Sequence, residues 1–328
     1  MAVYTVLETD FIAQFIKPYG VGCLLRFRGI GDGIENTNYF VTTDISQLES
    51  EISTASEREF VLTVFEELDN SDVQFYLNWL QRLKDHGVAV AAALFDSDGN
   101  NLQQVEGKPA ALFPRMAGEH IQTVNTAQAR SVGRAMAKMH LVAQHNPQTR
   151  HNSPKDFAWV ERSMTQLLPF LSDADAELLQ QSWYQAIAKI QQFELPSGII
   201  HSDLFRDNAL FIGDDLSTIL DLYSAGNGRF SYDLAVLVND WASQPDGQLI
   251  ADLQEAILQG YDEVRPRAAD EQQCWPELLQ LAAIRFWVSR LASIHIPTID
   301  HRPGALTQSK NPEQYKNILL ARLSMAAS

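Results

Sequence analysis

The chain has 328 residues, of which 45% are hydrophobic and 20% are charged, and its formal net charge is −16. These proportions are those of an ordinary globular protein that is long enough for two domains or lobes. The negative charge argues against nucleic acid as a partner and against anionic membrane surfaces, because both bind basic protein surfaces. A nucleotide remains possible, because Mg²⁺ and a few local donors can override the mean field.

The chain carries few signs of an extracellular or membrane protein. Its two cysteines, Cys23 and Cys274, form neither a disulfide framework nor a Cys-x-x-Cys metal site. Met1 to Lys17 lacks the basic stretch of a signal peptide, and the longest apolar run, Val88 to Phe95, is too short to span a bilayer. We therefore expect a cytoplasmic protein with reduced thiols.

The first third of the chain predicts a mostly antiparallel sheet with a helix across it. Thr9 to Ile16 predicts an amphipathic helix that stops near Pro18, and the apolar spacing from Val73 to His86 is also helical. Runs of β-branched and aromatic residues predict strands at 24–28, 39–43, 59–66, 88–95 and 110–114.

A glycine-rich segment separates the first two predicted strands. Gly29, Gly31 and Gly33 stand at alternate positions, and glycine permits backbone conformations that bring a loop close to a phosphate. A plain hairpin turn is the default interpretation. The chain has no Gly-x4-Gly-Lys-Ser/Thr loop, and no helix follows these glycines, which excludes the P-loop and the dinucleotide-binding fold.

The remaining two thirds predict helices around one central hairpin. Helical spacing is strongest at 126–142, 174–193, 277–291 and 311–323. We expect residues 1–111 to form an amino-terminal nucleotide-binding lobe, 112–118 to cross between lobes as a hinge, and 119–328 to form a catalytic lobe. His140 is expected to be packed and hydrogen-bonded rather than a ligand, and Asp233 to cap and brace the loop that follows residue 200.

That loop, His201 to Asn208, is the most informative stretch of the sequence. It contains Asp203 and leads into a predicted hairpin that returns to Asp221. A turn centred between Asp214 and Asp215 would place Asn208 directly opposite Asp221 at the open end of the hairpin, about 5 Å apart at Cβ.

Two acids and an amide at one end of a sheet point to metal and proton chemistry. Asn208 and Asp221 suit an oxygen-ligated cation such as Mg²⁺. Asp203, which is not tied to the metal, suits a base that takes a proton from a hydroxyl. A tight polar turn would explain Asp214 and Asp215, but not the polar residues where the hairpin opens.

The pattern His-x-Asp-x-x-x-x-Asn followed by a strand ending in Asp resembles the catalytic and metal loops of protein kinase-like phosphotransferases, in particular the aminoglycoside and choline kinase branch. Segments along nearly the whole chain narrow the resemblance to the bacterial homoserine kinases with the aminoglycoside phosphotransferase fold: 29–43, 60–66, 203–208, 232–241, 285–290 and 303–307. Thr63 stands where kinase-like enzymes usually carry lysine, and this family shares the threonine. Ser202 departs from the family, which usually has glycine there.

The resemblance implies a bilobal α+β fold with a small antiparallel sheet in the amino-terminal lobe and a mostly helical carboxy-terminal lobe. It implies ATP and L-homoserine as substrates, Mg²⁺ as cofactor, and O-phospho-L-homoserine as the product on the way to threonine. Asp203 would act as the base, and Asn208 and Asp221 would hold the metal. Nucleotide-binding residues would come from the glycine loop, strand and hinge: Gly29, Gly31, Gly33, Asn36, Thr37, Asn38, Thr63, Phe113, Arg115 and Met116.

Homoserine is a zwitterion with a primary hydroxyl, so its site needs charges of both signs. Asp240 is a candidate acid for its ammonium group, and Arg285 or Arg290 a candidate clamp for its carboxylate. Trp241 and Trp287 are candidate walls. Structural ion pairs and core aromatics are the ordinary interpretation of the same residues.

Other functions stay open at this point. Within the kinases, the acceptor could be choline, hydroxylysine, methylthioribose or an aminoglycoside. Outside them, the chain could be a nucleotide-binding regulator without activity, which the missing lysine suggests, or a plain amino-acid-binding module. The presence of Asp203, Asn208 and Asp221 together argues against a dead site.

Overall fold

The computed structural model describes residues 4–31, 36–46, 57–296 and 310–326. Contacts divide the chain into two compact units, the first ending at Met116 and the second beginning at Ala117. This boundary falls inside the 112–118 segment expected to be a hinge. Within the described ranges, no helix is both long and apolar enough to cross a membrane.

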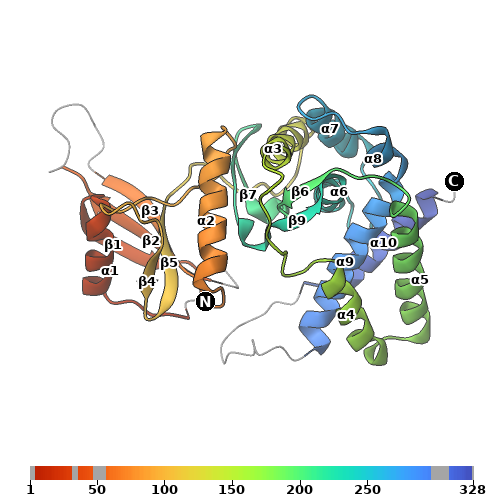
Figure 1. Ribbon diagram of the computed structural model, residues 1–328, viewed down its shortest axis with the longest axis horizontal. Coiled ribbons are helices and arrows are strands. Elements are labelled where there is room, and N and C mark those ends of the chain that lie inside the picture. The colour runs from red at the N-terminus through yellow and green to blue at the C-terminus, as the bar shows by residue number, and fades with distance from the viewer. Residues whose placement is uncertain (1–3, 32–35, 47–56, 297–309, 327–328) are drawn as a thin grey trace. The chain divides into compact units, whose positions relative to one another are not determined.

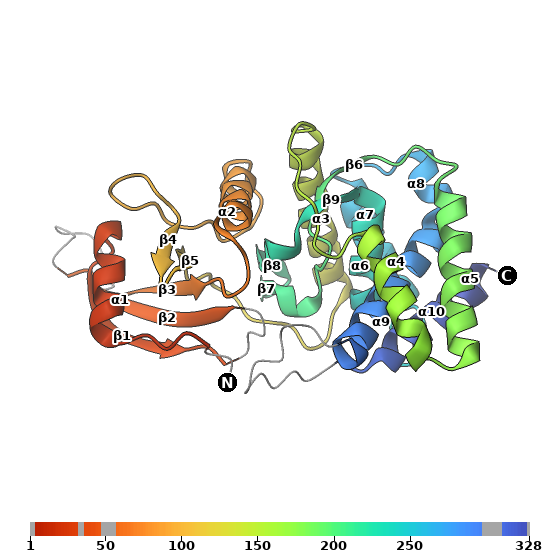
Figure 2. The same ribbon diagram turned by 60° about the horizontal axis from the view of Figure 1, so that its bottom comes forward.

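Unit 1 is built on a five-stranded antiparallel sheet with the order β1-β2-β3-β5-β4 (Figure 1). The strands are β1 (Cys23–Gly29), β2 (Thr37–Asp44), β3 (Glu57–Val64), β4 (Gln103–Val105) and β5 (Lys108–Pro114). Helix α1 (Thr9–Ile16) and helix α2 (Asn70–Asp85) lie on opposite sides of the sheet (Figures 1 and 2). The predicted helices and most of the predicted strands of this unit are confirmed.

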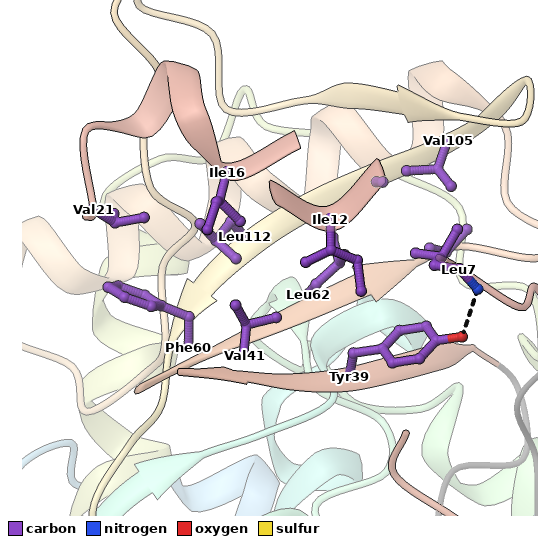
Figure 3. Packing of buried hydrophobic residues seen from close by; sticks show 12 residues of the cluster. Leu7, Ile12, Ile16, Val21, Tyr39, Val41, Phe60, Leu62, Val105 and Leu112 are labelled. Carbon is purple, nitrogen blue, oxygen red and sulfur yellow. Dashed lines mark hydrogen bonds between the residues drawn. The ribbon is translucent and has the colours of Figure 1, made fainter. Parts of the chain in front are cut away.

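Helix α1 covers the sheet with an apolar face. Ile12 and Ile16, four residues apart on one face of the helix, are buried against Tyr39, Val41 and Leu62 from alternate positions of β2 and β3. Figure 3 shows this cluster and the hydrogen bond that the backbone N–H of Leu7 donates to the Tyr39 hydroxyl over 3.1 Å. The alternation predicted from the sequence therefore separates the core face of the sheet from its other face.

The predicted strand from Val88 to Phe95 is wrong. The segment is extended and largely buried, but it forms no ladder with β5: the N–H of Leu94 donates to the carbonyl of Leu112 over 2.8 Å, and β5 pairs instead with β3 and β4. The edge of β5 is taken instead by β4, which a tight turn at Glu106 and Gly107 folds back onto it. An apolar run without alternation signalled burial here, not pairing.

Unit 2 is mainly helical. Its helices are α3 (Thr126–Gln144), α4 (Phe157–Leu167), α5 (Asp173–Ile190), α6 (Phe230–Trp241), α7 (Ala251–Asp262), α8 (Ala269–Gln273), α9 (Trp275–His295) and α10 (Pro312–Ala326). Helix α9 packs against α4, α5, α6 and α10, and it is apolar on nearly all sides, as a helix enclosed by others must be.

Two short antiparallel sheets carry the loops of unit 2. One pairs β6 (Ser197–Ile200) with β9 (Gly226–Arg229), and the other is the hairpin of β7 (Ala209–Ile212) and β8 (Asp215–Ile219). The expectation of a single hairpin was therefore incomplete. β9 was missed because it contains two glycines, and a Cβ on Gly228 would overlap the side chain of Ile200.

Helices α3 and α7 approach each other through glycines. A Cβ on Gly133 of α3 would overlap the carbonyl oxygen of Ile257 in α7. Conversely, a Cβ on Gly260 of α7 would overlap the carbonyl oxygen of Arg130 in α3. The two backbones are thus in direct contact, which only residues without a side chain allow.

Candidate active site

The loop His201–Asn208 links β6 to β7 and is held from below by Asp233 of α6. The N–H of His201 donates to Oδ2 of Asp233 over 2.9 Å, and the N–H of Ser202 donates to Oδ1 over 2.7 Å. Asp233 is fully buried, as the predicted brace should be. One carboxylate therefore fixes two successive peptide groups at the start of the loop.

Ser202 takes a backbone conformation that favours glycine. Its φ is 66°, in the left-handed region. Its hydroxyl donates to the carbonyl of Ser224 over 2.9 Å, which offsets part of the strain. The departure from the family therefore falls on a position where the backbone does restrict the residue.

A buried hydrogen-bond chain continues from Asp233 to His140 of α3. Arginine can only donate, so Nη1 of Arg265 donates to the Tyr261 hydroxyl over 2.9 Å, which leaves that O–H to donate to Nδ1 of His140 over 2.8 Å. Nε2 of His140 then carries the proton and donates to Asp233 over 2.9 Å. The directions of all three bonds are consistent with one tautomer and no net charge on the imidazole.

Burial agrees with this assignment. It lowers the pKa of His140, more than the neighbouring Asp233 raises it. Burial raises the pKa of Asp233, but the hydrogen bonds from His140 and His201 outweigh it, and the pKa ends below its usual range. We therefore assign a neutral histidine donating to a charged carboxylate, and the expectation of a packed, hydrogen-bonded His140 is confirmed.

Asp203 lies in the middle of the loop and is half-buried. Burial raises the pKa of its carboxyl, while the charges of Arg285 and His201 lower it. The carbonyl of Asp203 accepts a hydrogen bond from the side-chain amide of Asn208 over 2.9 Å, so the two ends of the loop are tied together. A carboxyl with a raised pKa, on a braced loop, is suited to accept a proton.

The hairpin places Asn208 and Asp221 at one end, although not in the expected register. The turn is formed by Gly213 and Asp214, with Ile212 facing Asp215. Gly213 has a φ of 62°, which a short hairpin turn requires, and this moves the turn one residue from the expected centre.

A turn moved by one residue shifts the pairing by two, and a bulge between Leu210 and Phe211 restores one of them. Asn208 is therefore opposite Leu220, whose N–H donates to the Asn208 carbonyl over 2.9 Å. Asp221 follows directly, is exposed, and has a left-handed backbone with φ 56° that ends the strand. The predicted direct pairing of Asn208 with Asp221 is therefore wrong by one residue, whereas both residues do lie at the open end of the hairpin.

These residues fit a hard divalent cation. Because the Asn208 amide nitrogen donates to Asp203, its Oδ1 faces elsewhere, and no donor within the described ranges reaches it. An amide oxygen and one carboxylate are few ligands for a metal ion. The described residues also contain no cluster of three His, Cys, Asp or Glu side chains that could hold a metal alone. Mg²⁺ is commonly held by one or two protein groups together with substrate phosphates and water.

Asp240 of α6 accepts hydrogen bonds from the same loop. Its Oδ2 accepts from the N–H of Arg206 over 2.9 Å and from Nε of Arg206 over 3.2 Å. Burial raises its pKa and Arg206 lowers it, with a net rise. Its neighbour Trp241 is 1% exposed, and its indole N–H donates to the carbonyl of Leu204 over 3.0 Å. Both residues therefore pack under the loop.

The two candidate clamps differ in their partners. Nη1 of Arg290 donates to the carbonyl of Asn311 over 2.7 Å and to the side chain of Gln314 over 2.9 Å. Arg285 is 3% exposed and lies 4.0 Å from the ring of Phe286, but within the described part of the chain its guanidinium has neither a hydrogen bond nor an ion pair. Trp287, beside it on α9, is 1% exposed and belongs to the core.

In unit 1, the polar residues after the glycine segment point to two different faces of the sheet. Asn38 and Thr63 face each other across β2 and β3, and the Thr63 hydroxyl donates to Oδ1 of Asn38 over 2.7 Å. Thr37 faces the other side, where its hydroxyl donates to Glu66 over 2.6 Å. Lys108 also donates to Glu66 over 2.6 Å, so this cation is held on the face that α1 covers.

The other residues expected to bind the nucleotide lie at the ends of these strands or in β5. Gly29 ends β1, Gly31 and Asn36 flank the segment that follows it, and Gly33 lies outside the described residues. Phe113 of β5 is 5% exposed and pairs with Val61 of β3.

The two residues after β5 lead to the end of unit 1. The guanidinium of Arg115 lies 4.5 Å from the ring of Phe40 and donates to Glu59 over 2.9 Å. Met116, the last residue of unit 1, is half-buried.

The sequence interpretation overlooked Tyr315. It lies on α10, is fully buried, and stacks with Phe205 of the loop at 6.1 Å between ring centroids. Its place in a helix rich in apolar residues gave no signal beyond an ordinary core position.

The chain is similar in sequence to several known proteins. The sequence profile of the phosphotransferase enzyme family matches residues 26–267. A homoserine kinase of Neisseria meningitidis serogroup B (strain ATCC BAA-335 / MC58) is 39% identical over 321 residues, which is 98% of this chain and 99% of that protein. A homoserine kinase of Janthinobacterium sp. (strain Marseille) is 34% identical over 330 residues, 99% of this chain and 97% of that protein.

Solved structures with the same fold are more distant in sequence. A microcompartment-associated aminopropanol kinase aligns with a TM-score of 0.71 at 18% identity over 98% of both chains. An amicoumacin kinase aligns with a TM-score of 0.69 at 12% identity over 98% of this chain and 94% of the other. The expected α+β kinase-like fold is confirmed, and the chain belongs to the phosphotransferase enzyme family.

Proposed function

We propose that the protein is a homoserine kinase that transfers the γ-phosphoryl group of ATP to the hydroxyl of L-homoserine, giving O-phospho-L-homoserine and ADP on the way to threonine. The observation that carries this proposal is the similarity to homoserine kinases over nearly the full length of the chain. The site supports it, because its acid, amide and arginine groups match the chemistry that the reaction needs.

In this proposal Asp203 orients the substrate hydroxyl and accepts its proton as the oxygen attacks the γ-phosphorus. A new oxygen–phosphorus bond forms, and the bond from phosphorus to the bridging oxygen of ADP breaks. The raised pKa of Asp203 makes its carboxylate a stronger proton acceptor than an exposed one, and the brace at Asp233 keeps it in position.

We assign the metal and nucleotide roles to residues of each unit separately. Asn208 and Asp221 would hold Mg²⁺, which neutralises phosphate charge when bound. In unit 1, backbone groups of Gly29, Gly31 and Gly33, with Asn36, Asn38 and Thr63 beside them, would bind the phosphates, and Phe113, Arg115 and Met116 would bind adenine. Thr37 is no longer a candidate, because its side chain is buried on the other face and bonded to Glu66. Thr63 offers a hydroxyl where many kinases offer a charge, so a bound metal would have to neutralise more of the phosphate charge.

Arg285 is our candidate for the substrate carboxylate. Its buried guanidinium lacks a partner among the residues described, whereas Arg290 is already bonded to the start of α10. Asp240 is the acid available for the substrate ammonium group. Trp241 and Trp287 are buried in the core and Arg290 is bonded to the start of α10, so we assign these three residues no direct contact with the substrate. Arginine can bind a carboxylate through two parallel hydrogen bonds.

The test is ADP release from Mg²⁺-ATP with a panel of acceptors. L-Homoserine should give the highest kcat/KM, above 3-aminopropan-1-ol, choline and hydroxylysine. The amino alcohol differs from homoserine only by the missing carboxylate, so it measures how strongly that group is recognised. Equal kcat/KM for homoserine and 3-aminopropan-1-ol would show that the carboxylate is not bound, and would refute the assignment.

A further inference from the structure

Tyr315 of α10 is a tyrosine whose ring is fixed on three sides. Phe205 stacks on it at 6.1 Å, Phe286 lies at 5.2 Å between ring centroids, and the guanidinium of Arg290 lies 4.4 Å from its centre. Phe205 is two residues beyond Asp203 on the catalytic loop. The ring therefore links α10 to that loop and has little freedom to turn.

The hydroxyl of this tyrosine is left without a partner. It is fully buried, and it has no hydrogen bond in the part of the chain that the structure describes. A buried unpaired hydroxyl destabilises a folded protein, and such groups are rare enough to need an explanation. Phenylalanine at this position would pack as well without that cost, so the oxygen itself needs a role.

Charges of both signs surround the hydroxyl. Burial raises the pKa of Tyr315 well above its ordinary value, so the group stays protonated and can donate. The charges of Asp240 and Asp203 also raise the pKa of Tyr315, and those of Arg290 and Arg285 lower it. Arg285, which is 3% exposed and has no hydrogen bond within the described ranges, lies 4.0 Å from the ring of Phe286, which itself packs on Tyr315. An arginine and a phenol O–H suit a carboxylate, whereas the arginine would repel an ammonium group.

We propose that Tyr315 is a specificity-determining residue that donates its hydroxyl hydrogen bond to the carboxylate of the amino-acid substrate held by Arg285. This inference rests on the proposed function, and it adds a residue on α10 to the site residues already named on the catalytic loop, the hairpin, α6 and α9. The two donors would bind one group, so removing both should cost less than the product of the single effects.

The test compares Tyr315→Phe with the unaltered enzyme on two substrates. For L-homoserine, kcat/KM should fall about tenfold or more, because a hydrogen bond to a charged group is lost. For 3-aminopropan-1-ol, which has no carboxylate, it should stay within about twofold. The thermal midpoint should be unchanged or higher, because the variant removes an unpaired buried group.

Tyr261→Phe is the matched control. Its hydroxyl is equally buried but bonded to His140 and Arg265, so this variant should lose stability and should not separate the two substrates. Unchanged kcat/KM for homoserine in Tyr315→Phe, or an equal fall for both substrates, would overturn the role of Tyr315. Failure of the unaltered enzyme to phosphorylate homoserine would instead overturn the proposed function, and the inference with it.

Discussion

Replacing His140 with glutamine should reduce the pH dependence of stability in unit 2. In the folded protein burial lowers the pKa of His140, whereas in an unfolded chain histidine titrates at about 6.5. Below that pH the unfolded chain binds a proton that the folded protein does not, so the free energy of unfolding decreases as the pH falls. Glutamine can still donate an amide N–H towards Asp233 but takes up no proton.

The expected change in the free energy of unfolding follows from the uptake of one proton by the unfolded chain. The free energy of unfolding should decrease by about 1.4 kcal/mol for each pH unit below about 6.5, until the lowered pKa of folded His140 is reached. Asp233 does not add to this slope. Its pKa is lowered in the folded protein, so its contribution to stability is complete above the ordinary pKa range of a carboxyl and is lost only at lower pH.

Urea unfolding at pH 7.5, 6.5, 5.5 and 5.0, followed by tryptophan fluorescence, measures this slope. Five of the six tryptophans lie in unit 2, so the signal reports mainly on that unit. The His140→Gln variant should lose the one-proton part of the slope, while Met139→Leu, a neighbouring core change without a titrating group, should keep it. Equal slopes in His140→Gln and the unaltered protein would refute the neutral, buried histidine.

Three further variants test the loop and the hairpin. Asp203→Asn should lower kcat by about two or more powers of ten with nucleotide affinity nearly intact, and near-normal turnover would exclude Asp203 as the base. Asp221→Ala should weaken Mg²⁺-nucleotide binding, measured by calorimetry, more than binding of the metal-free nucleotide, and equal losses would make Asp221 structural. Ser202→Ala keeps the left-handed strain and loses the bond to Ser224, so it should be less stable than Ser202→Gly by about 1 kcal/mol in thermal or urea unfolding, and the reverse order would contradict the strain.

The sequence was sufficient for the catalytic loop because its chemistry is local. Asp203 and Asn208 are five residues apart on one short segment, so their proximity follows from spacing. The brace by Asp233 could also be anticipated, since a buried acid at the start of an apolar helix needs donors. The helices were predictable for a similar reason, because the 3.6-residue period is read within one element.

The register of the hairpin and the pairing of strands were harder to predict from the sequence. The register of the hairpin differs from the prediction by one residue because Gly213 and Asp214, rather than the pair of aspartates, form the turn, and because a bulge lies between Leu210 and Phe211. The buried segment from Val88 to Phe95 has strand-like composition, but β4 pairs with residues 108–110 of β5, and among the described residues of the segment only Leu94 is bonded to β5 beyond them. The position of Tyr315 beside the catalytic loop follows from its ring contacts with Phe205 and Phe286, which are far from it in sequence. These features depend on which elements pack together in the folded chain, and the hydrophobic periodicity of a single element does not reveal its packing partner.

The glycine contact between α3 and α7 affects how a mutational scan of this protein should be interpreted. Any side chain at Gly133 or Gly260 would push two helix backbones apart, and α3 also carries His140, which reaches the brace of the catalytic loop. Scored by activity alone, both positions would rank with Asp203 although neither takes part in the chemistry. Parallel measurement of folded protein would separate them, because Asp203 variants should accumulate normally while substitutions at the two glycines should not.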